Sequence, residues 1–289
     1  MNLDHFGMDT ITLAGPLEGK LRAMRAAGFT QVMLNANDLA GHPGGPDAAI
    51  DTVRASGLRV TGFQVLRDFE GLSGHLHAYK VDIAKAMLSL CRALGSRVLL
   101  ACSSTSSHAT GEFDSLTRDL QKLAMLAVPY GIRIAYEALS WGRHVNEYPQ
   151  AWQIVGDADR ANRGLALDSF HRLATGTGRE ALEEIDPSKI FLVQLADFMW
   201  REIRSREERI DTARHFRVFP GEGVHGAEVS ALVRTLDRLG YRGDYSFEVF
   251  NDDYTQLPHA VVAERARRSV KWLTDQVSRR SLPLRGATR

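Results

Sequence analysis

The sequence has 289 residues and charges that nearly cancel, since 36 Lys and Arg residues face 35 Asp and Glu residues and leave a formal net charge of +1. This balance gives no electrostatic basis for binding nucleic acid or an anionic membrane surface. A hydrophobic fraction of 44% favours a packed core and excludes a disordered chain.

Strand-like and helix-like periods alternate along the whole chain, which predicts an α/β fold. The predicted strands are 6–13, 31–34, 58–65, 97–102, 132–137, 165–168, 190–194 and 245–250. The predicted helices are 17–27, 47–55, 79–94, 113–128, 149–155, 179–185, 227–239 and 262–277. Eight such units predict a single (β/α)8 barrel, a TIM barrel, over residues 1–278, with an open doubly wound sheet as the alternative. The basic tail at 279–289 is expected to be disordered.

Nothing in the sequence indicates export or a membrane anchor. Residues 1–5 do not resemble the start of a signal peptide, and no apolar run approaches the roughly 20 residues of a membrane span. We therefore expect a cytoplasmic protein. Cys91 and Cys102 lack zinc-ligand spacing, and we expect both to be small buried residues.

Each of the last four predicted strands ends in a side chain that carries oxygen: Glu137, Asp168, Gln194 and Glu248. Parallel barrel strands place their C-terminal ends on one face, where active sites lie, so we expect these side chains to converge. Three carboxylates at such short distances repel one another unless a positive charge lies between them. A hard divalent cation prefers oxygen ligands, and this set suits Mg²⁺, Mn²⁺ or Co²⁺. The sequence therefore predicts a metal-dependent enzyme.

Four further residues are expected to approach the same face. His171 follows the sixth strand, and a histidine with a near-neutral pKa is suited to act as a general base. Arg67 follows the third strand, and Arg217 lies in the long polar segment 197–225. Two arginines above an acidic metal site suit an anionic substrate, because guanidinium grips carboxylate through paired hydrogen bonds. His144 follows the fifth strand, and its role is open between substrate contact and loop structure.

Five stretches resemble the bacterial metal-dependent 3-dehydroshikimate dehydratases. They are YEALSWGRHVNE at 136–147, LDSFH at 167–171, FLVQLAD at 191–197, HFRVFPGEG at 215–223 and FEVFND at 247–252. Those enzymes belong to the xylose-isomerase-like barrel superfamily of sugar isomerases and epimerases, and the superfamily resemblance covers nearly the whole chain. In the dehydratases a Glu, an Asp, a Gln or His, and a second Glu hold the metal. The resemblance places these ligands at Glu137, Asp168, Gln194 and Glu248.

The activity that this resemblance implies is loss of water from 3-dehydroshikimate to give protocatechuate, through an enolate that the metal stabilises. His171 would remove the proton next to the ring ketone, Glu137 would complete the catalytic set as a metal ligand, and Arg67 and Arg217 would bind the substrate carboxylate. The implied partner is a small anionic cyclic or sugar-like molecule, with no nucleic acid and no membrane. A homo-oligomer stays open.

The second predicted strand departs from the family pattern. Where relatives resemble IEIFEND, residues 32–38 read VMLNAND, so two acidic positions are lost. This departure keeps open a sugar or polyol isomerase or epimerase, which would use the same enediolate chemistry without elimination. A non-catalytic binding barrel is a third alternative. Some relatives also carry a C-terminal dioxygenase-like domain, which we do not expect within these 289 residues.

Overall fold

Eight parallel strands close into a barrel in this computed structural model, which describes residues 3–156 and 161–278. The strands are β1 (Phe6–Asp9), β2 (Gln31–Asn35), β3 (Arg59–Arg67), β4 (Val98–Cys102), β5 (Arg133–Glu137), β6 (Arg163–Asp168), β7 (Ile190–Leu195) and β10 (Tyr245–Phe247). Pairing of β1 with β10 closes the ring. The predicted TIM barrel is confirmed, and the open sheet was the wrong alternative. The predicted tail at 279–289 lies outside the described residues.

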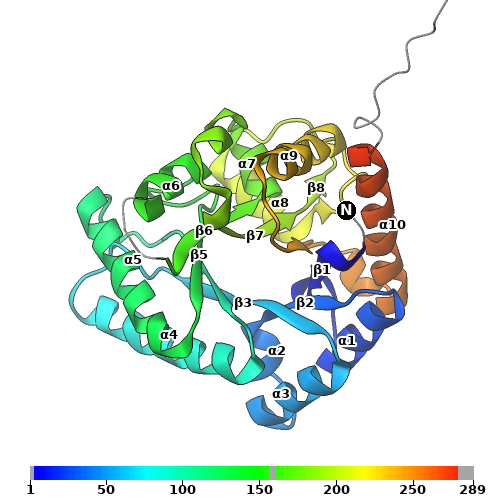
Figure 1. Cartoon of the computed structure of the whole chain (residues 1–289), viewed down its shortest axis with the longest axis horizontal. Coiled ribbons are helices and arrows are strands. Elements are labelled where there is room, and N and C mark those ends of the chain that lie inside the picture. Colours follow the sequence, from blue (N-terminus) through cyan, green and yellow to red (C-terminus); the bar gives the residue numbers. More distant parts are fainter. Residues whose placement is uncertain (1–2, 157–160, 279–289) are drawn as a thin grey trace, which may run out of the picture.

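Helices surround the barrel (Figure 1). They are α1 (Leu17–Ala26), α2 (Ala36–Ala40), α3 (Gly45–Ser56), α4 (Gly74–Leu94), α5 (Phe113–Ala127), α6 (Tyr148–Gly156), α7 (Ser169–Thr175), α8 (Arg206–His215), α9 (Gly226–Leu239) and α10 (His259–Ser278). Gly57 and Gly95 adopt the left-handed conformation directly after α3 and α4, which explains why a glycine marks these helix ends in the sequence. The first and last helices, α1 and α10, pack side by side (Figure 1).

The strands are buried on both faces, because their inner side chains fill the barrel and their outer side chains contact the helices. Every residue of β2, β4, β6 and β7 is buried. This two-sided burial is the reason that the strands read as nearly continuous apolar runs. The Phe6 ring stacks 5.8 Å from the Phe247 ring and ties the first strand to the last.

The polar segment 197–225 is more ordered than the sequence predicts. It contains β8 (Asp197–Phe198), α8 and β9 (Arg217–Val218), and the two short strands pair antiparallel outside the barrel. Helix α8 begins with a capping box, in which Ser205 accepts from the Glu208 N–H and Glu208 accepts from the Ser205 N–H. Two short helices at strand ends, α2 and α7, were also missed, and the predicted helix at 179–185 is a 3-10 helix (Glu180–Glu184).

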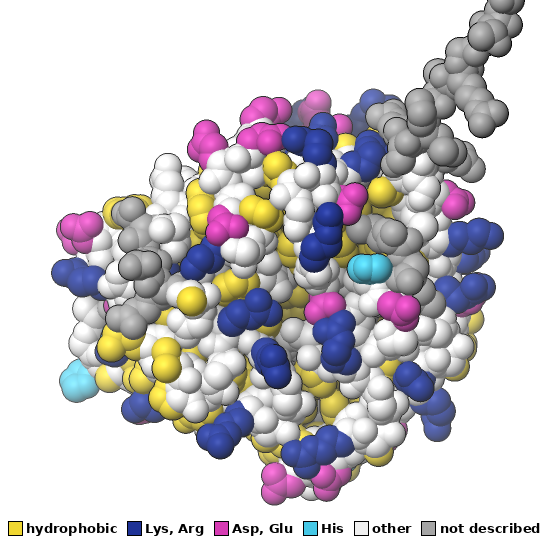
Figure 2. Space-filling view, viewed as in Figure 1, with side chains coloured by type: hydrophobic (Ala, Val, Ile, Leu, Met, Phe, Trp, Pro, Cys, Tyr) yellow, Lys and Arg dark blue, Asp and Glu magenta, His cyan; other side chains and the backbone are white. Residues whose placement is uncertain are grey.

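The surface matches the balanced composition. Figure 2 shows Lys and Arg side chains together with Asp and Glu side chains on the face in view. Among the described residues, no helix combines the length and the hydrophobicity that crossing a membrane requires.

Candidate active site

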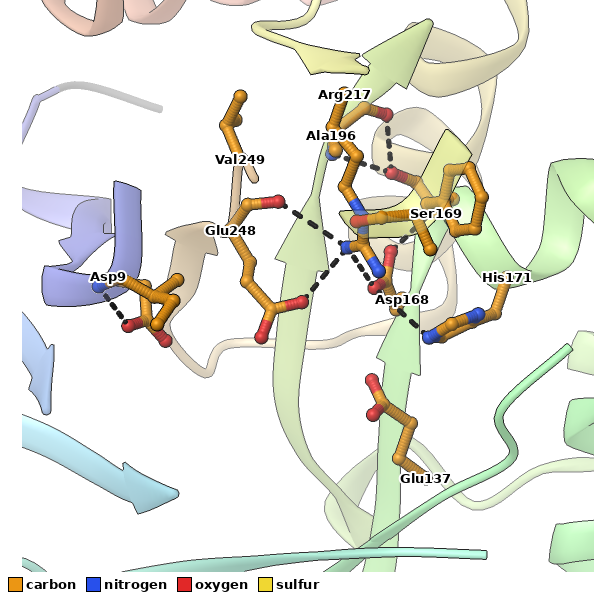
Figure 3. A network of polar contacts seen from close by, with 12 residues as sticks. Asp9, Glu137, Asp168, Ser169, His171, Ala196, Arg217, Glu248 and Val249 are labelled. Atoms are coloured by element: carbon orange, nitrogen blue, oxygen red, sulfur yellow. Dashed lines mark hydrogen bonds and ion pairs between the residues drawn. The ribbon is translucent and has the colours of Figure 1, made fainter. Parts of the chain in front are cut away.

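The C-terminal ends of the strands bring the four candidate metal ligands to one mouth of the barrel. Asp168 ends β6 and pairs in register with Gln194 of β7, Glu137 ends β5, and Glu248 directly follows β10. The exposed fractions are 3% for Glu137, 5% for Asp168, 0% for Gln194 and 5% for Glu248, so all four are buried. Ligand atoms of Glu137, Asp168 and His171 lie within 4.8 Å of one another. Figure 3 shows the Glu137 carboxylate turned toward this group.

Arg217 reaches the mouth from a segment outside the barrel. Its Nη1 donates to Asp168 Oδ2 at 2.7 Å and to Glu248 Oε2 at 2.9 Å (Figure 3). Its Nε donates to the Ala213 carbonyl at 3.0 Å, and its guanidinium carbon lies 4.4 Å from the centre of the Phe170 ring. Burial disfavours the charged form, but Asp168 and Glu248 raise the pKa of Arg217. A buried cation therefore offsets part of the carboxylate charge.

His171 is carried over the mouth by the first turn of α7. Asp168 caps this helix, since its Oδ1 accepts from the Phe170 N–H at 2.6 Å. His171 Nε2 then lies 3.7 Å from Asp168 Oδ2, and its Nδ1 accepts from the Ser140 N–H at 3.2 Å and lies 3.1 Å from Ser140 Oγ. Burial lowers the pKa of His171 to about 3, so the ring is neutral at physiological pH.

The group has more negative charge than Arg217 can offset. Burial, and then the charges of Asp168 and Glu248, raise the pKa of Glu137 well above its usual range. Burial also raises the pKa of Glu248, although Arg217 opposes that shift. Glu137 Oε1 and both polar atoms of the Gln194 side chain have no hydrogen-bond partner within the part of the chain that the structure describes. Unpartnered buried oxygens are costly, and carboxylate and amide oxygens with a nearby imidazole fit a divalent cation.

A cavity of about 290 Å³ opens beside these residues. Its lining combines Arg67, Arg214 and Arg217 with the aromatic rings of Trp141 and Phe250. Arginines with aromatic walls suit a small ring that carries a negative charge. The cavity thus has the size and the charge for a small anionic substrate.

The structure brings Arg67 to this cavity but not His144. Arg67 ends β3 and lines the cavity, and Lys80 Nζ donates to its carbonyl at 2.7 Å. His144 is exposed, its Nε2 bonds to the Ala109 carbonyl at 2.9 Å, and it is not among the lining residues. This contact joins the loop after β5 to the loop after β4. The observed position therefore matches the loop-structure alternative for His144.

Sequence reasoning missed four residues on the other strand ends. Asp9 ends β1, Asn35 ends β2, Gln64 lies near the end of β3 and Cys102 ends β4. Asn35, Gln64 and Cys102 line the cavity, whereas Asp9 lies fully buried behind Gln64 and accepts a hydrogen bond from its Nε2. For Asn35 and Cys102 the signal was the same one that identified the other four, a polar or thiol side chain at the end of an apolar run. Asp9 and Gln64 lie inside the predicted strands 6–13 and 58–65.

The chain matches a known protein family. The profile described as xylose isomerase-like TIM barrel matches residues 21–276. The chain belongs to that family. Within the xylose isomerase-like family, a 3-dehydroshikimate dehydratase of Pseudomonas aeruginosa is 38% identical over 267 residues, which cover 92% of this chain and 41% of the dehydratase. The predicted resemblance to such dehydratases is confirmed, although the chain spans less than half of that protein's length.

A second relative in sequence is an isomerase, and two solved structures share the fold. An inosose isomerase of Bacillus licheniformis is 30% identical over 208 residues, covering 70% of this chain and 69% of the isomerase. A fusion of a xylose isomerase-like TIM barrel with a 4-hydroxyphenylpyruvate dioxygenase superposes with a TM-score of 0.89 and 35% identity, covering 99% of this chain and 45% of the fusion. The zinc-bound IOLI protein superposes with a TM-score of 0.78 and 24% identity, covering 97% of this chain and 100% of IOLI, which shows a common fold.

Proposed function

We propose that the chain catalyses the loss of water from 3-dehydroshikimate to give protocatechuate. The observation that carries this proposal is the 38% identity to the Pseudomonas aeruginosa dehydratase over 92% of this chain. The buried carboxylates and the cavity of about 290 Å³ support it, because they offer acid–base groups and arginines to a small anionic ring.

We infer that a divalent metal ion, Mg²⁺, Mn²⁺ or Co²⁺, is held by Glu137, Asp168, Gln194 and Glu248. The unpartnered oxygens of Glu137 and Gln194 support this set. When bound, such an ion would supply positive charge that stabilises negative charge developing on the substrate ketone oxygen. His171 lies close enough to Glu137 and Asp168 to share their environment.

The proposed base is His171. One C–H bond next to the ketone and one C–O bond beyond it break, and the proton taken by His171 is returned to the departing hydroxyl, which leaves as water. A proton then moves from a ring CH2 to the ketone oxygen, which gives the aromatic phenol. A neutral ring is needed to accept the proton, and burial keeps His171 neutral by lowering its pKa to about 3. When the ring proton is on Nδ1 and bonds to Ser140 Oγ, Nε2 is free to accept. The Ser140 N–H favours the tautomer with the ring proton on Nε2, so Nε2 accepts the substrate proton only when the ring is in the Nδ1-protonated tautomer.

Arg67 is the proposed partner of the substrate carboxylate. It lines the cavity and is exposed, so its guanidinium is available to an incoming anion. Arg217 also lines the cavity, but its Nη1 is already held by Asp168 and Glu248. Arg217 therefore contributes positive charge to the wall and fixes two carboxylates, while Arg67 selects for a negative substrate.

The test is to incubate Mn²⁺-loaded protein with 3-dehydroshikimate and follow the ultraviolet absorbance of the aromatic product. Dehydration produces protocatechuate in proportion to substrate lost, and metal-stripped protein produces none. Failure of metal-loaded protein to form the aromatic product would refute the proposal.

A second candidate is an isomerase that runs the same proton removal without losing water. The 30% identity to the inosose isomerase favours it, and Asn35, in the altered second strand, lines the cavity. Incubation with inosose under the same conditions separates the two, since isomerisation changes the sugar without forming an aromatic ring.

A further inference from the structure

Cys102 and Glu137 lie side by side at the mouth. They are the last residues of β4 and β5 and are partners in the strand register, so their side chains project to the same face. The thiol donates to Glu137 Oε2, with Sγ 3.0 Å from the oxygen. The backbone holds this pair in place, because the Ser103 N–H donates to the Glu137 carbonyl at 2.8 Å and Ser103 Oγ accepts from the Leu139 N–H at 3.0 Å.

Because of this contact, the two oxygens of the Glu137 carboxylate differ in their hydrogen bonding. Oε2 is occupied by the thiol, whereas Oε1 has no partner among the described residues and is free to bind an ion. Glu137 as a residue belongs to the group that includes Asp168 and His171. A thiol is a weak donor, so it orients the carboxylate without withdrawing much of its negative charge.

We propose that Cys102 is a positioning residue that fixes Glu137 for metal binding, an inference that rests on the metal site of the proposed function. Cys102 acts through Glu137 and is not itself a ligand. Its sulfur is not part of the group of ligand atoms that lie within 4.8 Å of one another. Removing the hydrogen bond leaves Glu137 free to rotate, and its loss weakens metal binding even though all four ligands remain.

The experiment measures Mn²⁺ affinity by isothermal titration calorimetry on the full chain. Cys102→Ala removes the donor and is expected to weaken binding roughly tenfold to a hundredfold, the range found when the partners of metal ligands are lost. Cys102→Ser keeps a donor of similar size and is expected to restore most of the affinity. Cys91→Ala is the matched control, since Cys91 is equally buried but lies in α4, with its sulfur 4.0 Å from the Val98 carbonyl.

The control separates positioning from packing, because both alanine variants lose a buried sulfur while only one loses the Glu137 contact. Wild-type binding with unchanged affinity in Cys102→Ala would overturn the positioning role and leave the metal site standing. No binding by the wild type would overturn the metal site and this inference with it. A sulfur-to-cobalt charge-transfer band in Co²⁺-loaded wild type would show that Cys102 is a direct ligand, which also overturns the positioning role. None of these outcomes depends on whether the chain dehydrates 3-dehydroshikimate.

Discussion

The two sides of the barrel mouth both end their strands in polar side chains, but only one side leaves them unsatisfied. On the β1–β3 side, Asp9 Oδ1 accepts from the Ile11 N–H at 2.9 Å and its Oδ2 accepts from Gln64. Asn35 Oδ1 likewise accepts from the Asn37 N–H at 2.9 Å. The strand-end oxygens of Asp9 and Asn35 therefore have partners within the protein.

The side formed by β5, β6, β7 and β10 is different. Glu137 Oε1 and the Gln194 amide have no hydrogen-bond partner among the described residues, and Arg217 is shared between Asp168 and Glu248. In Figure 3 Asp9 lies apart from the group around Arg217. The comparison teaches that a polar strand end alone does not mark a site. A strand end whose buried oxygens lack hydrogen-bond partners does indicate a site, because such oxygens are available to bind an ion or a ligand.

The largest expected effect is on the unsatisfied side, in Glu248→Gln. This variant keeps size and hydrogen bonding but removes a charge, and we expect turnover to fall by at least about 10³-fold, because several kcal/mol of charge stabilisation depend on the ion. Product absorbance and Mn²⁺ calorimetry measure it. Glu183→Gln, at an exposed carboxylate paired with Arg238, is the control. Near-normal turnover in Glu248→Gln would contradict the ligand assignment.

Replacing the proposed base comes next. His171→Gln should lower kcat by about 10²–10⁴-fold, the usual contribution of a general base, with little change in KM. Mn²⁺ affinity should be nearly unchanged if His171 is a base, and a large loss of affinity would make it a ligand instead. Steady-state kinetics combined with calorimetry distinguish these, with His108→Gln as a control outside the cavity lining.

Glu70, in the loop after β3, provides a test through pH on the same side of the mouth. Its Oε1 accepts hydrogen bonds from the Ser104 N–H and from Tyr136 Oη, its Oε2 has no partner among the described residues, and burial raises its pKa to about 7. The folded state therefore binds the proton more tightly than the unfolded state, so this stability is present below about pH 4.5 and is lost as pH rises through about 7. The loss amounts to at most about 3 kcal/mol.

Urea unfolding of wild type and Glu70→Gln at pH 5 and pH 8.5 isolates this contribution, since other buried carboxyls are common to both proteins. The variant should lose less stability than the wild type between these two pH values. Equal losses in the two proteins would show that Glu70 has an ordinary pKa.

A smaller effect is expected at Arg67. Arg67→Met should raise KM for 3-dehydroshikimate about tenfold to a hundredfold with kcat nearly unchanged, because a hydrogen-bonded ion contact to the carboxylate contributes about 1.5–3 kcal/mol. The matched control is Arg92→Met, on the exposed face of α4. An unchanged KM would show that the substrate carboxylate binds elsewhere, with Arg214 and Arg217 as the other arginines of the cavity.

The smallest effect should come from Asn35, which caps the short helix α2. Asn35→Ala should reduce the free energy of unfolding by about 1 kcal/mol, and Asn35→Ser, which also caps, should recover most of it. Denaturant unfolding measures both. A larger loss in Asn35→Ser than in Asn35→Ala would mean that capping is not what Asn35 contributes.

The barrel and the four strand-end residues Glu137, Asp168, Gln194 and Glu248 could be predicted because both follow from local periodicity. Apolar runs about 30 residues apart define the parallel strands, and the last polar residue of each run defines its end. The β1–β3 side was harder to read. The first strand was predicted to extend to residue 13, whereas β1 ends at Asp9, so the polar residue that marks its end was hidden inside the predicted strand.

The remaining features depend on contacts between distant parts of the chain. No periodicity reveals that Arg217 bonds to Asp168 and Glu248, or that Ser140 holds the His171 ring. Helix α8 escaped prediction because its charged sequence has no apolar stripe, although the capping box at Ser205 was a readable signal. Whether an oxygen has a partner is a three-dimensional property, and for that reason the sequence could indicate the candidate ligands but not explain why they differ from Asp9.

The β8–α8–β9 segment suggests a route for engineering. The backbone of Arg217 is held outside the barrel strands by two hydrogen bonds. Its N–H donates to the Phe250 carbonyl, and its carbonyl accepts from Asn251 Nδ2 at 2.8 Å. Replacing the β8–α8–β9 segment with another segment of equal length would therefore change the charge above the cavity, while the eight strands of the barrel kept their hydrogen bonds. Selectivity for substrate charge would in this way be altered separately from the stability of the barrel.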